Sequence, residues 1–133
     1  MIEAVVAKHV VLIDPDRDSR RNSQFLLQLS NLQVTCFEYL DEALNWLLCL
    51  GGRPDGVDLV AVKNHSDSVE NRFFIATICR LVPVLMVASR REEMQGLVDC
   101  LKDDESLSFD WCLKEEFHHR LLPANGALPK PLL

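Results

Sequence analysis

The stretch GVDLVAVKNHSD, residues 56 to 67, places a run of strand-forming residues directly before a polar segment. Residues 57–62 are mostly aliphatic or β-branched, as in a buried strand, and the polar residues 63–65 follow them. Open α/β sheets usually carry their functional groups just past the carboxyl ends of such strands. The sequence therefore predicts a functional position at residue 63, and it fills that position with a lysine.

Strand and helix patterns alternate along the rest of the chain. Four further runs are typical of strands, at residues 9–14, 33–39, 82–89 and 108–114. Helical patterns lie between and after them, at residues 18–31, 40–52, 71–81, 91–104 and 115–122. Near-continuous apolar strands separated by helices predict a parallel sheet that is covered on both faces. We therefore predict one α/β domain over residues 1–122 and a Pro-rich tail or linker at residues 123–133.

Individual helical segments carry capping and periodicity signals. Asp18 or Ser19 suits the N-cap of the first helix, because either side chain can accept a hydrogen bond from a backbone N–H. The third segment, residues 71–81, is apolar on nearly every side, which predicts a well-buried helix. In the fourth segment the apolar residues follow helical spacing and form one stripe of Met94, Leu97, Val98 and Leu101.

Composition excludes several classes of protein. The 133 residues are 48% hydrophobic and 26% charged, as in one ordinary globular domain. A formal net charge of -6 argues against binding to nucleic acid or to an anionic membrane face. No apolar run approaches the ~20 residues that span a bilayer, and we find no signal-peptide pattern. The five cysteines form no C-x-x-C pair, which predicts reduced, buried thiols in a cytoplasmic protein.

Three stretches of the chain are distinctive: VVLIDPDRDSRR at residues 10–21, VPVLMVASRRE at residues 82–92, and the lysine of WCLKEEF at residues 111–117. Together they resemble the CheY-like receiver domain of bacterial two-component response regulators. The resemblance covers roughly residues 9–122. It implies a flavodoxin-like (βα)5 fold, in which a doubly wound, parallel, five-stranded sheet has helices on both faces.

The resemblance also implies a phosphorylation site, which this sequence matches only in part. In the family, two adjacent acids after the first strand hold Mg²⁺, which clamps a phosphoryl group on an aspartate after the third strand. Asp14 takes the position of the first acid, but Pro15 takes the second and has no ligand to offer. Lys63 takes the phosphoacceptor position, where an ammonium group cannot form an aspartyl phosphate.

The remaining positions of the family's site are also altered. Asp16 is displaced by one residue from the lost second acid. Ala88 stands where the family has the Thr or Ser hydroxyl that binds the phosphoryl group, with Ser89 one residue later. Lys114 matches the family's lysine, but Glu115 replaces the usual following proline. Three of the five functional positions lack the required chemistry, so we predict a pseudo-receiver with no metal site and no cofactor.

We expect Lys63 to neutralise the acids that remain. Because strands one and three are neighbours in this fold, its ammonium group should lie within about 4 Å of Asp14, or within one bridging water of it, and near Asp16. Such a pair would replace the charge of the metal and lock the domain in one state. The alternative is a solvated lysine at the rim of the sheet.

The chain has a candidate interaction surface near its C-terminal end. By count from Lys114, Trp111 takes the position of the family's switch aromatic, and without a hydroxyl at residue 88 there is room for its ring. The alternative is an ordinary strand tryptophan that packs against the last helix. That helix is short, which would leave apolar surface to be covered by a partner or a second copy. The candidate interface residues are Met94, Leu97, Val98, Leu101 and Trp111.

No sequence feature predicts catalysis. There is no G-x-S-x-G, P-loop or G-x-G-x-x-G motif, so we expect no enzymatic activity. Asp67 lies four residues past the phosphoacceptor position, too far to share a pocket with Asp14. The residues His65, His118 and His119 lack the spacing of metal ligands, and solvated histidines explain them better.

These observations predict a phosphorylation-independent module that binds a protein partner or an output domain in bacterial signalling. A homodimer would use the same candidate surface. Two alternatives remain open. One is an active phospho-receiver that uses Asp14 or Asp16 in a remodelled acidic site, and the other is a small-molecule sensor that binds its ligand in the same crevice.

Overall fold

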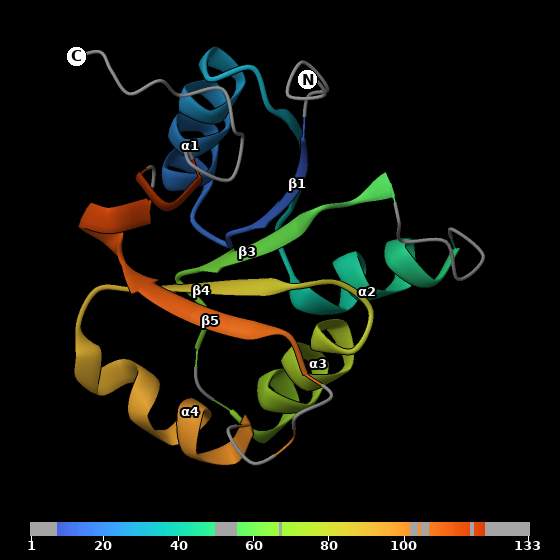
Figure 1. Ribbon diagram of the computed structural model, residues 1–133, viewed down its shortest axis with the longest axis vertical. Helices are drawn as coiled ribbons and strands as arrows, with labels where there is room; N and C mark the ends of the chain where they lie inside the picture. The colour runs from blue at the N-terminus through green and yellow to red at the C-terminus, as the bar shows by residue number, and fades with distance from the viewer. Residues whose placement is uncertain are drawn as a thin grey trace, which may run out of the picture.

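The computed structural model describes residues 8–49, 56–66, 68–101, 104, 107–117 and 119–121. In this part of the chain, five parallel strands form one sheet in the order β2-β1-β3-β4-β5 (Figure 1). This is the strand order of the flavodoxin-like fold, so the predicted fold is confirmed. The predicted tail at residues 123–133 lies outside the described residues.

Each described element overlaps a segment that the sequence predicts. The strands are β1 (His9–Ile13), β2 (Gln33–Phe37), β3 (Leu59–Lys63), β4 (Val84–Ala88) and β5 (Phe109–Leu113). The α-helices are α1 (Arg17–Leu29), α2 (Leu40–Cys49), α3 (Val69–Cys79) and α4 (Gln95–Leu101). Two 3₁₀ helices are η3 (Arg91–Met94) and η4 (Lys114–Glu116). Among the described residues, no helix is both long enough and apolar enough to cross a membrane.

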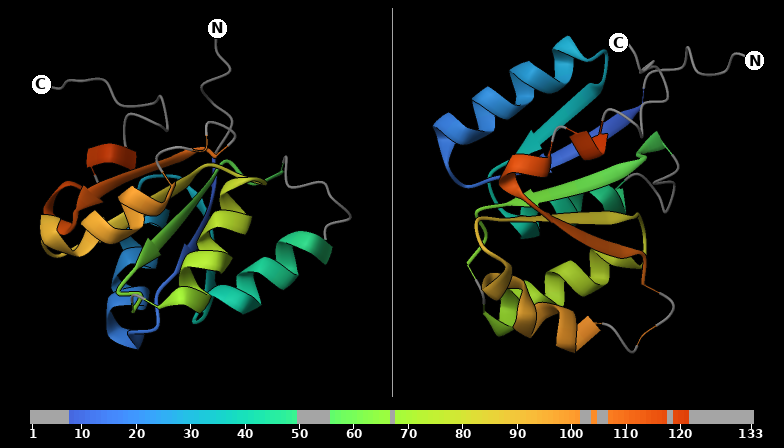
Figure 2. Two further views of the ribbon diagram at one scale, coloured as in Figure 1. Left: turned by 90° about the horizontal axis from the view of Figure 1, so that it is seen from below. Right: turned by 60° about the vertical axis from the view of Figure 1, so that its left-hand side comes forward.

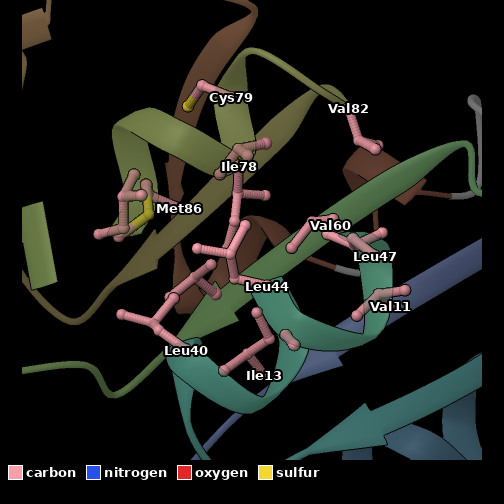
Figure 3. Packing of buried hydrophobic residues seen from close by; sticks show 14 of the residues in the cluster. Val11, Ile13, Leu40, Leu44, Leu47, Val60, Ile78, Cys79, Val82 and Met86 are labelled. Carbon is pink, nitrogen blue, oxygen red and sulfur yellow. The ribbon is translucent and has the colours of Figure 1, made fainter. Parts of the chain in front are cut away.

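Two hydrophobic clusters lie on opposite faces of the sheet. The larger cluster joins the strands to α2, α3 and α4, and Figure 3 shows Leu44, Ile78 and Met86 within it. The smaller cluster joins the other face to α1 and to the segment after β5, through Leu27 and Phe117. Figure 2 shows α1 on the side of the sheet away from α3 and α4. Because both faces are covered, the central strands are buried, as their apolar runs predict.

The strand order determines where a site can form. β1 pairs with β2 on one side and with β3 on the other. The direction in which successive strands are added to the sheet therefore reverses between β1 and β3. Ile13 lies opposite Val62 in this pairing. Asp14 comes directly after Ile13 and Lys63 directly after Val62, so the two residues are neighbours at the carboxyl edge of the sheet. This is the edge where α/β sheets bind their ligands.

The start of α1 differs from the prediction. The N-cap is Asp16, whose Oδ1 accepts a hydrogen bond from the backbone N–H of Ser19 at 3.0 Å. Asp18 lies in the first turn instead, where its negative charge suits the helix dipole. The apolar side chains of this helix are only partly buried, because Leu27 is buried whereas Phe25 and Leu29 are exposed.

The prediction that the third helix is well buried is confirmed for one side of the helix only. Val69 and Phe73 of α3 are 85% and 65% exposed. They lie four residues apart and therefore share one side of the helix. The buried side is formed by Ile75, Ile78 and Cys79. An apolar composition without clear periodicity does not show which side of a helix faces the core.

All five cysteines are free thiols, but they are not all buried. Burial raises the pKa of Cys79 to about 12 and that of Cys112 to about 11, so both remain protonated at neutral pH. Burial also raises the pKa of Cys36. Cys49 and Cys100 are exposed, so the expectation that the thiols are buried is confirmed for only part of the set.

Candidate functional site

Asp14 lies directly after β1 and is completely buried, with 0% of its surface exposed. Its Oδ1 accepts hydrogen bonds from the backbone N–H of Asp16 at 2.9 Å and from the side-chain amide of Asn64 at 3.0 Å. Its Oδ2 accepts a bond of 2.6 Å from the Ser19 hydroxyl. Three hydrogen bonds to an ionised carboxylate offset much of the free-energy cost of burying it.

Lys63 is the last residue of β3, and its side chain is only 9% exposed. The ammonium Nζ donates a hydrogen bond of 2.7 Å to the hydroxyl of Ser23, which is also buried. The same nitrogen lies 5.2 Å from the centre of the Phe117 ring, within the range of a cation–π interaction. The Lys63 side chain therefore connects β3 with α1 and with the segment after β5.

The predicted direct contact between Lys63 and Asp14 is wrong, and the alternative of one bridging water between them stays a prediction. Among the described residues, no carboxylate oxygen lies within 4.0 Å of the Lys63 ammonium group. Lys63 still belongs to β3 and extends toward Ser23 on α1. Asn64 follows with a left-handed φ of 56°, which asparagine tolerates, and its amide occupies the place beside Asp14.

The electrostatic environment of Lys63 has several sources. Burial lowers the pKa of its ammonium group below the ordinary value. The Asp14 carboxylate acts in the opposite direction at longer range, with a smaller contribution from Asp16. The positive charge of Lys114 lowers the pKa further. Because burial dominates, the protonated Lys63 is less favourable in the folded protein than in the unfolded chain.

This shift predicts how stability depends on pH. The unfolded chain holds the Lys63 proton up to a pKa of about 10.4, whereas the folded protein releases it at lower pH. We therefore expect Lys63→Met to have the higher unfolding free energy near pH 7. Its advantage should shrink as pH rises through the depressed folded pKa toward the unfolded value. Urea unfolding of wild type and variant across this range measures the difference.

The matched control for this experiment is Arg21→Met, because Arg21 is exposed, its replacement removes the same charge, and it is not among the charges that shift the pKa of Lys63. We expect the unfolding free energy of this variant to follow the wild type at every pH. A stability difference between wild type and Lys63→Met that does not change with pH would contradict the assignment of a lowered pKa to Lys63.

The other predicted site positions are only partly brought together. Pro15 is exposed, and the Asp16 carboxylate serves as the helix cap. Ala88 ends β4 and is buried, whereas Ser89 is exposed. Lys114 is exposed at the start of η4, close enough to affect the pKa of Lys63. The structure thus places the Asp16 carboxylate at a helix end and leaves Ser89 exposed after β4.

Sequence reasoning missed the polar residues that hold the site together. Ser19 and Ser23 lie four residues apart on α1, so they share the side of the helix that faces the sheet. Asn64 directly follows the strand, at a position where a left-handed turn is common for asparagine. Serine spacing at the start of the helix and an asparagine after a buried strand were the signals available in the sequence.

The candidate interface is also corrected by the structure. Met94, Leu97 and Leu101 are buried in the larger hydrophobic cluster, so their stripe faces the core and offers no surface to a partner. The ring of Trp111 is half-buried against the same cluster, with the Arg91 guanidinium 5.7 Å from its centre. Val98, the fourth residue of the stripe, is partly buried beside them.

The histidines do not form a site with other ligands in the described part of the chain. No three His, Cys, Asp or Glu side chains come together there as a metal-binding group. Asp67 and His118 lie outside the described residues. His65 lies on the loop after β3, whereas His119 follows η4.

Comparison with known proteins was made by sequence and by structure. Neither a model of a protein family nor a curated protein matches the sequence. Solved structures do match. A response regulator receiver domain protein from Clostridium thermocellum aligns with a TM-score of 0.70 at 15% identity, covering 90% of this chain and 91% of the other. The chemotaxis protein CheY4 of Vibrio cholerae aligns with a TM-score of 0.66 at 15% identity, covering 89% and 98%.

A third match has a further domain. A protein described as a two-component system response regulator/GGDEF domain protein aligns with a TM-score of 0.62 at 19% identity. The alignment covers 92% of this chain but 51% of that protein. Identities this low establish a common fold and not a common activity. The chain thus has the fold of the CheY-like receiver domains of response regulators.

Proposed function

We propose that this chain is a receiver-like signalling module of the bacterial two-component type, and that it works without aspartyl phosphorylation. It acts by binding a protein partner or an output domain and is not an enzyme. The observation that carries this proposal is the buried Lys63, which takes the phosphoacceptor position that the resemblance implies. Its ammonium group donates a hydrogen bond of 2.7 Å to the Ser23 hydroxyl. A protonated amine cannot replace the carboxylate that accepts a phosphoryl group in this fold.

The remaining acids support the proposal because their arrangement does not suit Mg²⁺. This ion prefers octahedral coordination by oxygen ligands, and it usually keeps several waters. Both carboxylate oxygens of Asp14 already accept hydrogen bonds, Pro15 offers no ligand, and Asp16 caps a helix. The ammonium group of Lys63 adds a nearby positive charge that repels a dication. We therefore assign no metal to this crevice.

The fourth strand supports the same conclusion. A hydroxyl at its end would hold a phosphoryl oxygen, but Ala88 has none and is buried. The Trp111 ring therefore has no hydroxyl there to respond to. It packs beside the Arg91 guanidinium group instead, which lies 5.7 Å from the centre of the ring.

Incubation with acetyl phosphate and Mg²⁺ tests the proposal. We expect the intact mass of the wild-type protein to remain unchanged, because no carboxylate at the crevice is both free and placed beside a metal site. An ordinary receiver domain treated in parallel shows that the reagent works. A phosphoryl adduct on the wild type that disappears in Asp14→Ala or Asp16→Ala would contradict the proposal and favour a remodelled, active site.

A further inference from the structure

A cavity of about 500 Å³ opens beside the crevice, at the carboxyl edge of the sheet. It lies where β1 and β3 end, between the first turns of α2 and α3. This is the switch point of the strand order, where open α/β sheets commonly bind ligands. Its lining residues are Ile13, Pro15, Glu38, Tyr39, Leu40, Asp41, Val62, Lys63, Asn64, His65, Ser66, Glu70, Asn71 and Phe74.

The lining combines apolar surface with negative charge. Aliphatic and aromatic side chains, among them Tyr39 and Phe74, form much of the wall. Glu38, Asp41 and Glu70 add three carboxylates, none of which has an ion-pair partner among the described residues. The ammonium group of Lys63 is directed to Ser23 on the α1 side of the sheet, and it forms no ion pair with these three carboxylates.

An exposed apolar surface continues from this cavity along α3. The ring centre of Phe73 lies 6.0 Å from that of the lining residue Phe74, and Val69 shares the side of α3 that carries Phe73. Tyr39 is also exposed, at 53%, on the opposite side of the opening. Large apolar side chains gathered beside a cavity are typical of a protein interaction site.

The charge of the lining selects the kind of occupant. The N-termini of α2 and α3 would favour an anion, but the three carboxylates oppose one. A bare metal ion is also excluded by the spread of these acids, since no three of the described acidic, His or Cys side chains come together. An organic cation with apolar neighbours matches both the negative lining and the exposed side chains of α3.

We propose that this cavity receives an arginine side chain of a partner protein, flanked by apolar residues that pack on Val69 and Phe73. That the arginine belongs to a protein rests on the function proposed above. Arginine suits the site better than lysine, because its planar guanidinium group stacks on aromatic rings and binds carboxylates through two hydrogen bonds. Tyr39 and Phe74 offer the rings, and Glu70 and its two acidic neighbours offer the carboxylates.

Two-dimensional ¹H–¹⁵N NMR of the full chain tests this proposal with a defined probe. The probe is the peptide acetyl-Leu-Arg-Leu-amide, and its control carries the neutral isostere citrulline in place of arginine. We expect saturable shifts at residues 38–41, 64–66 and 69–74 with the arginine peptide. The citrulline peptide should bind about tenfold more weakly, because its side chain lacks the charge that strengthens hydrogen bonds to carboxylates.

Matched variants separate local from general effects. Glu70→Gln should weaken binding of the arginine peptide about three- to tenfold, whereas Glu92→Gln on η3 changes the net charge equally and should have no effect. Phe73→Ser should also weaken binding. Its control is Leu29→Ser on α1, because Phe73 and Leu29 are similarly exposed, at 65% and 68%.

Three results would overturn the inference. They are shifts outside the cavity, equal affinity of the two peptides, and equal effects of Glu70→Gln and Glu92→Gln. Absence of binding of the arginine peptide at millimolar concentration would also overturn it. None of these results affects the outcome of acetyl phosphate labelling, so the site and the proposed function can fail independently.

Discussion

Asp14→Ala is expected to lower the unfolding free energy by about 3 kcal/mol, the largest stability effect that we predict for a single substitution. The change removes the acceptor of three hydrogen bonds, so the Asn64 amide, the Ser19 hydroxyl and a backbone N–H lose a buried partner. It also removes the carboxylate that contributes most to raising the pKa of Lys63. Urea unfolding at pH 7 measures the loss.

Two comparisons identify the source of this loss. Asp18→Ala removes an exposed acid of the same helix start and should cost only a few tenths of a kcal/mol. Adding Lys63→Met to Asp14→Ala should restore more stability than Lys63→Met gives in the wild type, because the buried ammonium group has then lost its main opposing charge. A cost below about 1 kcal/mol for Asp14→Ala would show that its hydrogen bonds contribute little to stability.

Restoring the acceptor alone should not restore phosphorylation. Lys63→Asp supplies a nucleophile, but Pro15 still withholds a metal ligand and Ala88 still lacks a hydroxyl. Each missing contact to a transferring group typically costs a factor of about 10² to 10³ in rate. Labelling of the single variant by acetyl phosphate should therefore stay near background.

The triple variant Lys63→Asp, Pro15→Asp, Ala88→Thr should become measurably labelled in the presence of Mg²⁺. It restores a second acid, an acceptor and a hydroxyl in the positions where the family has them, and Lys114 is already present. Circular dichroism of each variant confirms that it is folded before its labelling is compared. Labelling of the single variant at the rate of an ordinary receiver would mean that Asp16 and Ser89 already complete a working site.

Much of the fold could be predicted because burial on both sides leaves a clear mark on a strand. The runs that became β1, β3 and β4 contain almost only aliphatic side chains, since neither face of the sheet meets solvent there. The positions of Asp14 and Lys63 at the carboxyl edge followed from the strand order. Their side-by-side placement is a property of the sheet and not of the side chains.

The contacts of the site could not be predicted in the same way. The direction of a long side chain at the end of a strand depends on which partner is closest in space, and Ser23 lies 40 residues from Lys63 in sequence. Helix periodicity shows that Met94 and Leu97 share a side, but it does not show whether that side meets the core or a partner. The buried side of α3 was harder still to predict, because apolar residues occur all around this helix.

The burial of Lys63 makes an aspartate at this position costly for folding. Aspartate at position 63 would place a second carboxylate near the fully buried Asp14 and would remove the Lys63 ammonium group, which leaves the more distant Lys114 as a neighbouring positive charge. The first step toward an active switch would then weaken folding and give no activity in return. Substitutions at positions 15 and 88 have no benefit until the acceptor is present. Under the function proposed above, substitutions that improve a binding surface are therefore accessible one at a time, whereas a phosphorylation site would need several substitutions together.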